Sequence, residues 1–395
     1  MSLVFFDDHS WQKLQPLTLT KPVSHLRCGI DTLKEKWEHL MACGTSGYIT
    51  TKYLQERFTA PPGGTYLLIN GSVIPDENLC AQIHALPNES VLMHGEIILA
   101  AHAKIGNHLR EQDLFALLHQ IEKVTYSRAF LKLNHLWDIF GLNGKILETD
   151  FTRITRGRVS AQLPASNKIL GNGNFFAEQD AQAEACIFNT KSGSIYLGKH
   201  TEVMEGTVIR GAFALCEGAQ VKLSSKIYGP TTIGPHCRVG GEVNNSVMQA
   251  YSNKGHDGFL GNSVIGEWCN LGADTNTSNL KNNYGEVDIY DYAEKKYKGS
   301  GLQFCGLFMG DHSKCGINTM FNTGTVVGVS ANIFGAGFPP KFIPSFSWGG
   351  FDRNIAFRID KALELALRVM ERRDYTPAKE ELAVLNHLYQ NRENE

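Results

Sequence analysis

Apolar side chains recur at every sixth position through the middle of the chain. The first tract comprises Leu197, Val203, Ile209, Leu215, Val221, Ile227, Ile233 and Val239. An α-helix repeats its apolar face every 3.6 residues and a half-buried strand every two, so neither element explains a period of six. The pattern therefore indicates a repeat architecture.

The period returns in two later tracts, Phe259, Ile265 and Leu271, and then Met309, Cys315, Phe321, Val327 and Ile333. Four residues after each apolar position the side chain is small, as at Thr201, Thr207, Ala219, Ser225 and Thr319, with Phe213 as the exception. A hexapeptide repeat is typical of a parallel β-helix, in which each short strand sends one aliphatic side chain inward. An ordinary β-sandwich, the competing interpretation, has no reason to keep one register for so long.

Strands and helices alternate before the repeats. The hydrophobic pattern predicts strands over 3–6, 47–50, 65–70, 91–93 and 96–100, and helices over 31–41, 114–124 and 131–140. Alternation of this kind favours an α/β, Rossmann-like layered domain with a mainly parallel sheet, which we place at residues 1–150.

The remaining boundaries follow from the repeat. Residues 151–180, with Pro164 and Gly171, are expected to be a linker, and residues 181–347 the β-helix. The register is interrupted at 244–258 and 276–307, and such insertions are expected to protrude as loops, often on the binding side. Residues 348–395 predict a helical cap for the open end, with helices from near Asp352 to Arg373 and over 379–391.

Composition limits the classes of partner and compartment. The 395 residues carry a formal net charge of −2, which argues against a nucleic-acid groove or a polybasic membrane surface. The start lacks a basic n-region and no apolar run could span a bilayer, so a cytoplasmic protein without a membrane or nucleic-acid partner is expected. Nine cysteines occur without a C-x-x-C pair, and Cys237, Cys269 and Cys315 fall on repeat positions, which favours reduced core residues.

The segment 252–266 carries the candidate chemistry, and it reads Ser-Asn-Lys-Gly-His-Asp-Gly-Phe-Leu-Gly-Asn-Ser-Val-Ile-Gly. It resembles the acetyltransferase half of the bifunctional glucosamine-1-phosphate acetyltransferase and N-acetylglucosamine-1-phosphate uridyltransferase family, whose motif is Lys-x-x-His-x-x-Tyr-[Leu/Ile]-Gly-Asp-x-x-Ile-Gly. The resemblance implies that His256 is catalytic and that Lys254 and Asn270 contact the acyl acceptor, while Asn279 lies near acetyl-CoA. It also implies a left-handed β-helix, acetyl-CoA or another acyl-CoA as co-substrate, and a homotrimer with sites between neighbouring β-helices.

The chemistry is consistent with these residue types. Acyl transfer from a thioester needs a base for the attacking amine or hydroxyl, and a neutral His suits that task near pH 7. The alternative is a surface-loop His satisfied by water. The family's motif Tyr is Phe259 here, and a phosphate-gripping Arg is replaced near Tyr228, so glucosamine 1-phosphate is not assured as the acceptor.

The first domain resembles sugar nucleotidyltransferases over 17–30 and again over 67–72. The resemblance implies that Thr20, Lys21 and Arg27, with Asn70 and Gly71, bind an NTP and a sugar 1-phosphate. Mg²⁺ is a possible cofactor of this domain, with unknown ligands, because Ser72 stands where the family has its metal-binding Asp; the candidate substitutes are Asp7, Asp8 and Asp76.

Three functions remain open at this point. The chain is either a bifunctional enzyme that forms an NDP-sugar and transfers an acyl group to a sugar, or an acyltransferase whose first domain binds nucleotide or sugar without catalysis. A scaffold whose solenoid only assembles trimers is the third possibility, and it predicts no binding of acyl-CoA.

Overall fold

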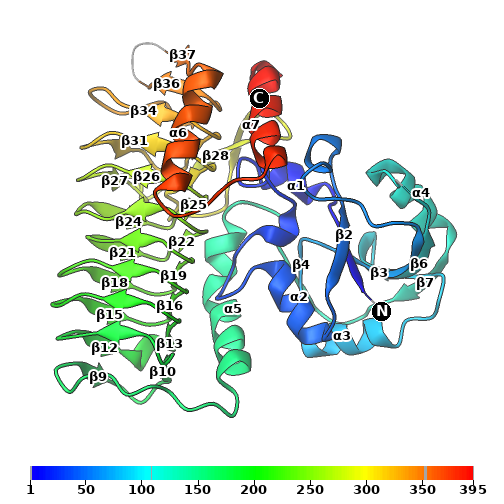
Figure 1. Cartoon of the computed structure of the whole chain (residues 1–395), viewed down its shortest axis with the longest axis horizontal. Helices are drawn as coiled ribbons and strands as arrows, with labels where there is room; N and C mark the ends of the chain where they lie inside the picture. The colour runs from blue at the N-terminus through cyan, green and yellow to red at the C-terminus, as the bar shows by residue number, and fades with distance from the viewer. Residues whose placement is uncertain (1, 108, 351–353, 395) are drawn as a thin grey trace.

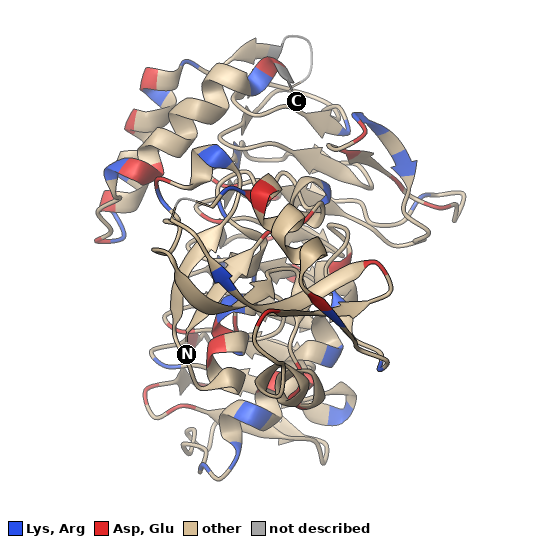
Figure 2. Ribbon diagram, turned by 90° about the vertical axis from the view of Figure 1, so that its right-hand side faces the viewer, with Lys and Arg blue, Asp and Glu red and all other residues tan. Residues whose placement is uncertain are grey.

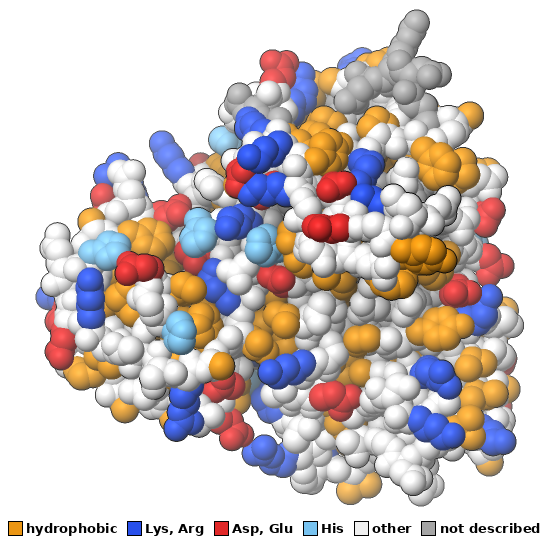
Figure 3. Space-filling model, turned by 180° about the vertical axis from the view of Figure 1, so that it is seen from behind, with side chains coloured by type: hydrophobic (Ala, Val, Ile, Leu, Met, Phe, Trp, Pro, Cys, Tyr) orange, Lys and Arg blue, Asp and Glu red, His pale blue; other side chains and the backbone are white. Residues whose placement is uncertain are grey.

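The computed structural model describes residues 2–107, 109–350 and 354–394. It consists of an N-terminal α/β body and a β-helix that stand side by side, with helix α5 between them (Figure 1). Lys and Arg are interspersed with Asp and Glu over the body that faces the viewer in Figure 2, and Figure 3 shows the same mixture from behind. Within the described residues, no helix is long and apolar enough to cross a bilayer.

The N-terminal body is built on a six-stranded sheet of order β2-β1-β3-β6-β5-β7. The β1–β2, β1–β3 and β5–β7 pairs are parallel, whereas β3–β6 and β5–β6 are antiparallel. The expected mainly parallel sheet is therefore correct for β2-β1-β3 and wrong for β3-β6-β5. The strands are β1 (Leu3–Phe6), β2 (Thr45–Ile49), β3 (Gly64–Asn70), β5 (Ser90–His94), β6 (Ile97–Ile105) and β7 (Glu122–Thr125).

Two helices of this body begin at side-chain caps, one at Thr32 and one at Asp76. Helix α2 (Leu33–Met41) starts at a capping box in which Thr32 and Glu35 satisfy each other's backbone N–H groups. Helices α3 (Glu77–His84) and α4 (Glu111–Gln120) follow, and α4 is shorter than expected because residues 122–125 pair with β5 instead.

The expected helix over 131–140 is wrong. Residues Leu131–Lys132 form strand β8, which pairs with β4 (Val73–Ile74), and α5 runs instead from Asp138 to Thr155. Asp138 marks the true start because its carboxylate accepts hydrogen bonds from the backbone N–H groups of Asn134 and His135. The apolar residues before it serve a short strand and a turn.

The repeat region forms the expected left-handed parallel β-helix, whose coils stack three strand columns. Face 1 contains β10 (Phe175–Ala177), β13 (Ile195–Leu197), β16 (Phe213–Leu215), β19 (Thr231–Ile233), β22 (Val247–Met248), β25 (Val264–Ile265), β30 (Leu307–Met309), β33 (Thr325–Val327) and β35 (Phe342–Ile343). Face 2 contains β11 (Gln182–Ala183), β14 (Glu202–Val203), β17 (Gln220–Val221), β20 (Arg238–Val239), β23 (Asn253–Lys254), β26 (Asn270–Leu271), β31 (Lys314–Cys315), β34 (Asn332–Ile333), β36 (Ser347–Gly349) and the antiparallel β37 (Asn354–Ala356). Face 3 contains β9 (Lys168–Leu170), β12 (Ile187–Asn189), β15 (Val208–Arg210), β18 (Lys226–Tyr228), β21 (Glu242–Asn244) and β24 (Phe259–Gly261), and β27 (Asn276–Thr277) pairs with β32 (Met320–Phe321) in the coils beyond.

The predicted inward residues are confirmed with one exception. The first and third apolar tracts lie in a single buried cluster inside the coil. In the second tract Leu260, not Phe259, occupies the interior, because Leu260 pairs in register with the inward Val243. All nine cysteines are free, and Cys237, Cys269 and Cys315 are buried, as their repeat positions predicted.

The two interruptions of the repeat behave differently. The segment 244–258 is not a protruding loop: Gln220 pairs with Arg238 eighteen residues on, and Arg238 pairs with Asn253 fifteen residues on, so the coil is merely shorter there. The second is a true insertion that contains the hairpin β28 (Asp288–Asp291) and β29 (Lys296–Gly299). This hairpin folds back on its own chain, where the Tyr290 ring stacks on Phe342 at 3.7 Å between centroids.

The predicted linker contains more structure than expected, whereas the first helix of the predicted cap is shorter than expected. Helix α5 extends to Thr155, and the first coil begins at β9, so part of 151–180 belongs to elements of both bodies. Asp352, the expected start of the penultimate helix, lies outside the described residues; α6 spans Ile359–Glu371, and α7 matches its predicted range at Lys379–Asn391.

Helix α7 joins the two bodies rather than only covering the end of the coil (Figure 1). The ring of His387 stacks on Tyr53 of the N-terminal body at 4.4 Å, and Glu381 pairs with Arg57 at 3.0 Å. Helix α6 buries Ala362, Ala366 and Met370, the first two in the same apolar cluster as α7. The C-terminal helices therefore brace the β-helix against the α/β body.

Candidate functional site

His256 lies at the corner between faces 2 and 3 of the β-helix. It belongs to the turn of residues 255–258 that connects β23 with β24, and its side chain is exposed. Its place in the coil is thus a corner of a continuous solenoid and not the loop that the sequence predicted. The exposed imidazole remains a candidate base that a ligand could approach from solvent.

Lys254 enters the interior of the β-helix beneath that corner. It takes the register position of the inward Val239, and only 1% of it is exposed. Its ammonium donates hydrogen bonds to the carbonyl oxygens of Gly240, at 3.1 Å, and of His256, at 2.9 Å. The side chain therefore fixes the backbone of the His256 corner, and its amine is not presented to a ligand.

Burial sets the protonation behaviour of this lysine. Loss of solvation lowers the pKa of the Lys254 amine to about 8, against the opposing attraction of Asp257 and Asp274. Lys314, two coils further on, is half-buried in register with the outward Asn270. It donates to the carbonyl of His312 at 2.8 Å, and loss of solvation lowers its pKa to about 8.

Replacing Lys254 with Met should change how stability depends on pH. Between pH 8 and pH 10.5 the unfolded chain binds more protons at this residue than the folded chain, so the wild-type free energy of unfolding rises with pH. Relative to Lys254→Met, the wild type should gain about 2–3 kcal/mol between pH 7 and pH 10. Chemical denaturation at several pH values measures this gain. Lys226→Met, which removes an exposed lysine, is the control, and equal curves for the wild type and Lys254→Met would contradict the burial of a charge.

The other predicted acyl-transfer residues lie on separate surfaces of one chain. Asn270 is exposed on face 2, in β26 of the coil after His256. Asn279 follows β27 at the opposite end of face 3, where its amide donates to the Asn262 side chain at 2.8 Å. Gly261 is required beside it, because a Cβ there would lie 2.7 Å from the Asn279 amide nitrogen.

The predicted phosphate-binding residues of the N-terminal body lie in its contact with the β-helix. The Lys21 ammonium pairs with Glu267 at 2.7 Å and with Asp311 at 2.9 Å, and Thr20 donates to Asp311 at 2.5 Å. Lys21 is 3% exposed. Burial alone would lower the pKa of Lys21, but Asp311 and Glu267 outweigh it and raise that pKa above its usual value.

Arg27 belongs to the same contact. Its backbone N–H donates to the Gln249 side chain at 2.6 Å, and its carbonyl accepts from the same amide at 3.0 Å. The guanidinium is buried and donates to the carbonyl of Ile30. Sequence reasoning missed the partners of these residues on the β-helix, which are Gln249, Glu267 and Asp311. Each stands next to a Gly or an apolar residue of the repeat, and nothing in the repeat marks such a position as a contact between domains.

Asn70 ends strand β3, and Gly71 follows it beside the backbone of Ser24. The Asn70 amide donates to the Asp8 carboxylate at 3.0 Å, and Lys132 pairs with Asp8 at 3.1 Å. Burial raises the pKa of Asp8, but Lys132 and the hydrogen bonds outweigh it and hold the pKa below its usual value. In contrast, burial raises the pKa of the neighbouring Asp7 to about 7.

A cavity of about 340 Å³ opens beside these carboxylates, lined by Asp7, Asp8, His9, Trp11, Gln12, Thr51, Glu111 and Phe115. It lies just beyond the carboxyl end of β1, the edge at which open α/β sheets bind ligands. Its carboxylates would repel a triphosphate unless a cation neutralised them.

The described residues do not fit a divalent cation. Among them no cluster of three or more His, Cys, Asp or Glu side chains could hold a metal ion. Ser72, at the family's metal position, donates its hydroxyl to the Asn70 side chain at 2.6 Å, and Asp8 is neutralised by Lys132. The expectation of Mg²⁺ therefore finds no suitable donor set here.

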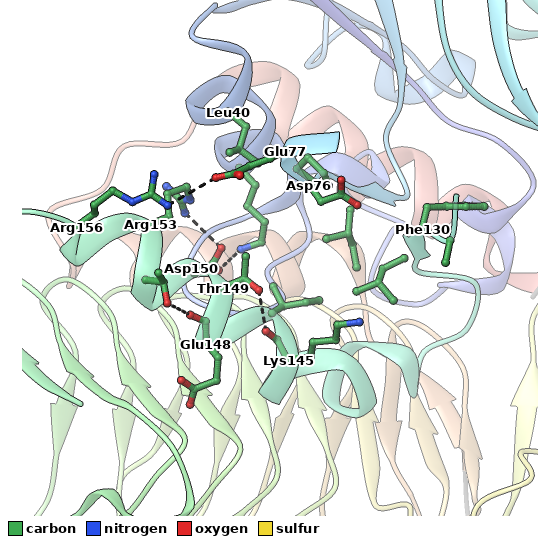
Figure 4. Close-up of a pocket in the computed structure, with 17 residues that line it drawn as sticks. Leu40, Asp76, Glu77, Phe130, Lys145, Glu148, Thr149, Asp150, Arg153 and Arg156 are labelled. Carbon is green, nitrogen blue, oxygen red and sulfur yellow. Dashed lines mark hydrogen bonds and ion pairs between the residues drawn. The ribbon is translucent and has the colours of Figure 1, made fainter. Parts of the chain in front are cut away.

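A second cavity, of about 600 Å³, lies between α5 and the elements α2, α3 and β8 (Figure 4). Most of its cations are already paired: Lys36 with Asp150, Arg153 with Asp31 at 2.5 Å, and Arg156 with Glu77 at 3.6 Å. Its other walls are apolar and include Leu40 and Phe130. Asp76, one of the candidate metal ligands, lines this cavity, and its carboxylate accepts a hydrogen bond from the backbone N–H of Leu79 at 2.9 Å at the start of α3.

Comparison with known proteins places these two bodies in context. Residues 3–159 match the family model described as sugar nucleotidyl transferase. The chain is 25% identical over 224 residues to the bifunctional sugar-1-phosphate nucleotidylyltransferase/acetyltransferase of Sulfurisphaera tokodaii. The aligned part covers 56% of this chain and 49% of that protein. The chain is 27% identical over 171 residues to the bifunctional protein GlmU of Cupriavidus pinatubonensis, over 36% of this chain and 37% of the relative.

These matches confirm the predicted resemblance to sugar nucleotidyltransferases and to bifunctional nucleotidyltransferase/acetyltransferase proteins, which are transferases. The matched part spans about half of the first relative and about a third of the second. Among solved structures, the polysialic acid-specific acetyltransferase NeuO matches with a TM-score of 0.31 and 14% identity, over 53% of this chain and all of that one. The UDP-N-acetylglucosamine acyltransferase of Francisella novicida gives 0.33 and 11%, over 55% and 75%.

Proposed function

We propose that this chain is a sugar-phosphate transferase with the two-domain arrangement of its bifunctional relatives, in which the β-helix transfers an acyl group from acyl-CoA to a sugar. The observation that carries the proposal is the exposed His256 at a β-helix corner whose backbone Lys254 holds from inside. The family resemblance of the segment 252–266 and the bifunctional relatives support it. A cytoplasmic location belongs to the proposal, since acyl-CoA and NTP are cytoplasmic substrates.

The proposed reaction uses His256 as a general base. The neutral imidazole takes the proton of the attacking amine or hydroxyl as its nitrogen or oxygen bonds to the acyl carbon. The thioester C–S bond then breaks, and the CoA thiolate leaves and accepts the proton from the imidazolium. Backbone N–H groups at the Gly-rich corner of residues 255–258 are suited to stabilise the oxyanion.

The separation of His256 from Asn279 supports a site shared between copies of the chain. The two residues stand at opposite ends of face 3, so one chain does not bring them together. A homotrimer with face 3 turned towards a neighbouring corner would supply His256 from one copy and Asn279 from the next. Phe259, half-buried on β24, offers the acceptor no hydroxyl, so we expect an acceptor other than glucosamine 1-phosphate to be preferred.

The acyl-transfer proposal is tested by the release of free thiol. Purified protein is mixed with acetyl-CoA or a longer acyl-CoA and a panel of amino-sugar phosphates and nucleotide sugars. Turnover with at least one acceptor is expected. Absence of thiol release and of acyl-CoA binding throughout the panel would favour the scaffold function instead.

Nucleotidyl transfer by the N-terminal body is the second candidate function, and its family-model match favours it. The engagement of Lys21 with two carboxylates of the β-helix weighs against it, because these charges already neutralise the ammonium that would hold a triphosphate. We therefore propose that this body binds a nucleotide or sugar without transfer.

The prediction is that no NTP and sugar 1-phosphate pair yields pyrophosphate above the level of a boiled control. An enzyme-coupled pyrophosphate assay with each NTP measures this, with and without added Mg²⁺. Release with any pair would restore the bifunctional reaction and would require Lys21 to leave its partners.

A further inference from the structure

Three cations gather on face 2 of the β-helix, one coil below His256. Arg238 lies in register between Gln220 and Asn253 of the neighbouring coils. Each of these amides holds a second cation: the Lys222 ammonium donates to Gln220 at 3.0 Å, and the Arg373 guanidinium donates to Asn253 at 2.7 Å. Arg238 is thus flanked on both sides by a positive group.

The cluster carries more positive charge than its surroundings neutralise. All three side chains are half-buried, and among the described residues none of them has a carboxylate within ion-pair distance, whereas Arg57 and Arg158 do. Burial and the charges of Arg238 and Arg373 lower the pKa of Lys222, against the weaker attraction of Glu202. Like charges held together in this way are costly unless an anion joins them.

The cluster adjoins the His256 corner. Gly240 follows Arg238 by two residues, just beyond the end of β20, a separation of about 7 Å in extended chain. The Gly240 carbonyl and the His256 carbonyl are joined by the one Lys254 ammonium. Between them the surface is open at Gly255, where an added Cβ would meet nothing within 4 Å. A ligand held at Arg238 can therefore extend to the corner without crossing a side chain at that position.

We propose that Lys222, Arg238 and Arg373 form a phosphoryl-binding site that anchors a substrate of the reaction at His256. The inference rests on the proposed function. Two guanidinium groups present planar pairs of N–H donors that match phosphate oxygens, and the lysine adds a point charge. The phosphoryl group belongs either to the CoA part of the acyl donor or to a phosphorylated sugar acceptor, and both present the same chemistry to this cluster.

Arg373 of the C-terminal segment contributes one of the three cations of this site. It directly follows α6, so the helix that packs on the β-helix also delivers one of the three cations. Neither the hexapeptide pattern nor the motif of residues 252–266 contains Arg373.

The test is binding measured by calorimetry, which does not depend on turnover. The ligands are CoA, 3′-dephospho-CoA, pantetheine, glucosamine 1-phosphate and glucosamine, each with the wild type, Arg238→Gln and Arg373→Gln. Arg368→Gln, on the exposed side of α6, is the matched control. A lost charge-assisted hydrogen bond corresponds to a rise of about 10- to 100-fold in Kd for phosphorylated ligands, with pantetheine and glucosamine unaffected.

The outcomes separate the two sources and the two proposals. A rise confined to CoA identifies the acyl donor, and a rise confined to glucosamine 1-phosphate identifies the acceptor. Unchanged affinities in both arginine variants, or no binding of any phosphorylated ligand by the wild type, would overturn the phosphoryl site. If His256→Ala loses turnover but still binds phosphorylated ligand in a way that depends on Arg238, both proposals are supported. If binding depends on Arg238 but the wild type transfers no acyl group, only the proposed function is overturned. Thermal unfolding of each variant checks that the fold persists.

Discussion

Replacing His256 with Ala is expected to lower kcat for acyl transfer by about 10²- to 10⁴-fold, the usual contribution of a general base. The fold should be unaffected, because the imidazole is exposed and the hydrogen bond that Lys254 donates to this residue is accepted by its carbonyl oxygen, which Ala retains. Thiol release under saturating acyl-CoA measures the effect, and thermal unfolding should move by no more than a surface substitution moves it.

The matched control is His200→Ala, which removes another exposed imidazole from a corner of the same β-helix. It should leave kcat within about twofold of the wild type, since a surface imidazole without a role contributes nothing to the barrier. If both variants turn over like the wild type, His256 is a solvated corner residue and acyl transfer must be assigned to other groups. A loss in both variants would indicate a general disturbance of the coil.

The β-helix could be predicted from the sequence because its signal is local and repeated. Each inward residue, such as Ile209 or Val327, is separate evidence for the same coil, so one misassigned position does not change the predicted fold. The error at Phe259 arose where coils are shorter than eighteen residues: Arg238 pairs with Asn253 fifteen residues on, and Val243 pairs with Leu260 seventeen residues on. A fixed period of six cannot follow coils of these lengths. His256 was found because its motif is contiguous in the chain.

The contact between the two bodies could not be predicted in the same way. Lys21 and Arg27 stand in a segment that resembles a phosphate loop, and nothing local shows that their partners lie more than 200 residues away. Lys254 is a second case: a lysine inside a β-helix contradicts the apolar rule for that position, and only the three-dimensional structure shows the two carbonyls that satisfy it. Lys21 and Arg27 therefore belong to contacts between distant segments, and Lys254 to a contact inside the coil, and the pattern of adjacent residues contains neither.

Replacing Lys21 with Met should destabilise the protein by about 3–5 kcal/mol, because it leaves Asp311 charged and buried without its partner. Asp311 is only 3% exposed, and the remaining hydrogen bonds, from the Thr20 hydroxyl and the backbone N–H of Glu267, do not neutralise it. Chemical denaturation followed by intrinsic fluorescence measures the loss. Lys34→Met, which removes a partly exposed lysine paired with Glu38, is the control and should cost less than about 1 kcal/mol.

The pH dependence of the wild type provides an independent check on the same pair. The folded-state pKa of Asp311 lies below its ordinary value of 3.8, so its contribution is present above that pH and is lost as the pH falls through the folded pKa. The folded-state pKa of Lys21 lies above 10.5, so its contribution is present below that pH and is lost as the pH rises further. In Lys21→Met the lysine part of this dependence should vanish. A variant as stable as the wild type, with weaker nucleotide binding, would instead return Lys21 to a phosphate-binding role and free the N-terminal body for nucleotidyl transfer.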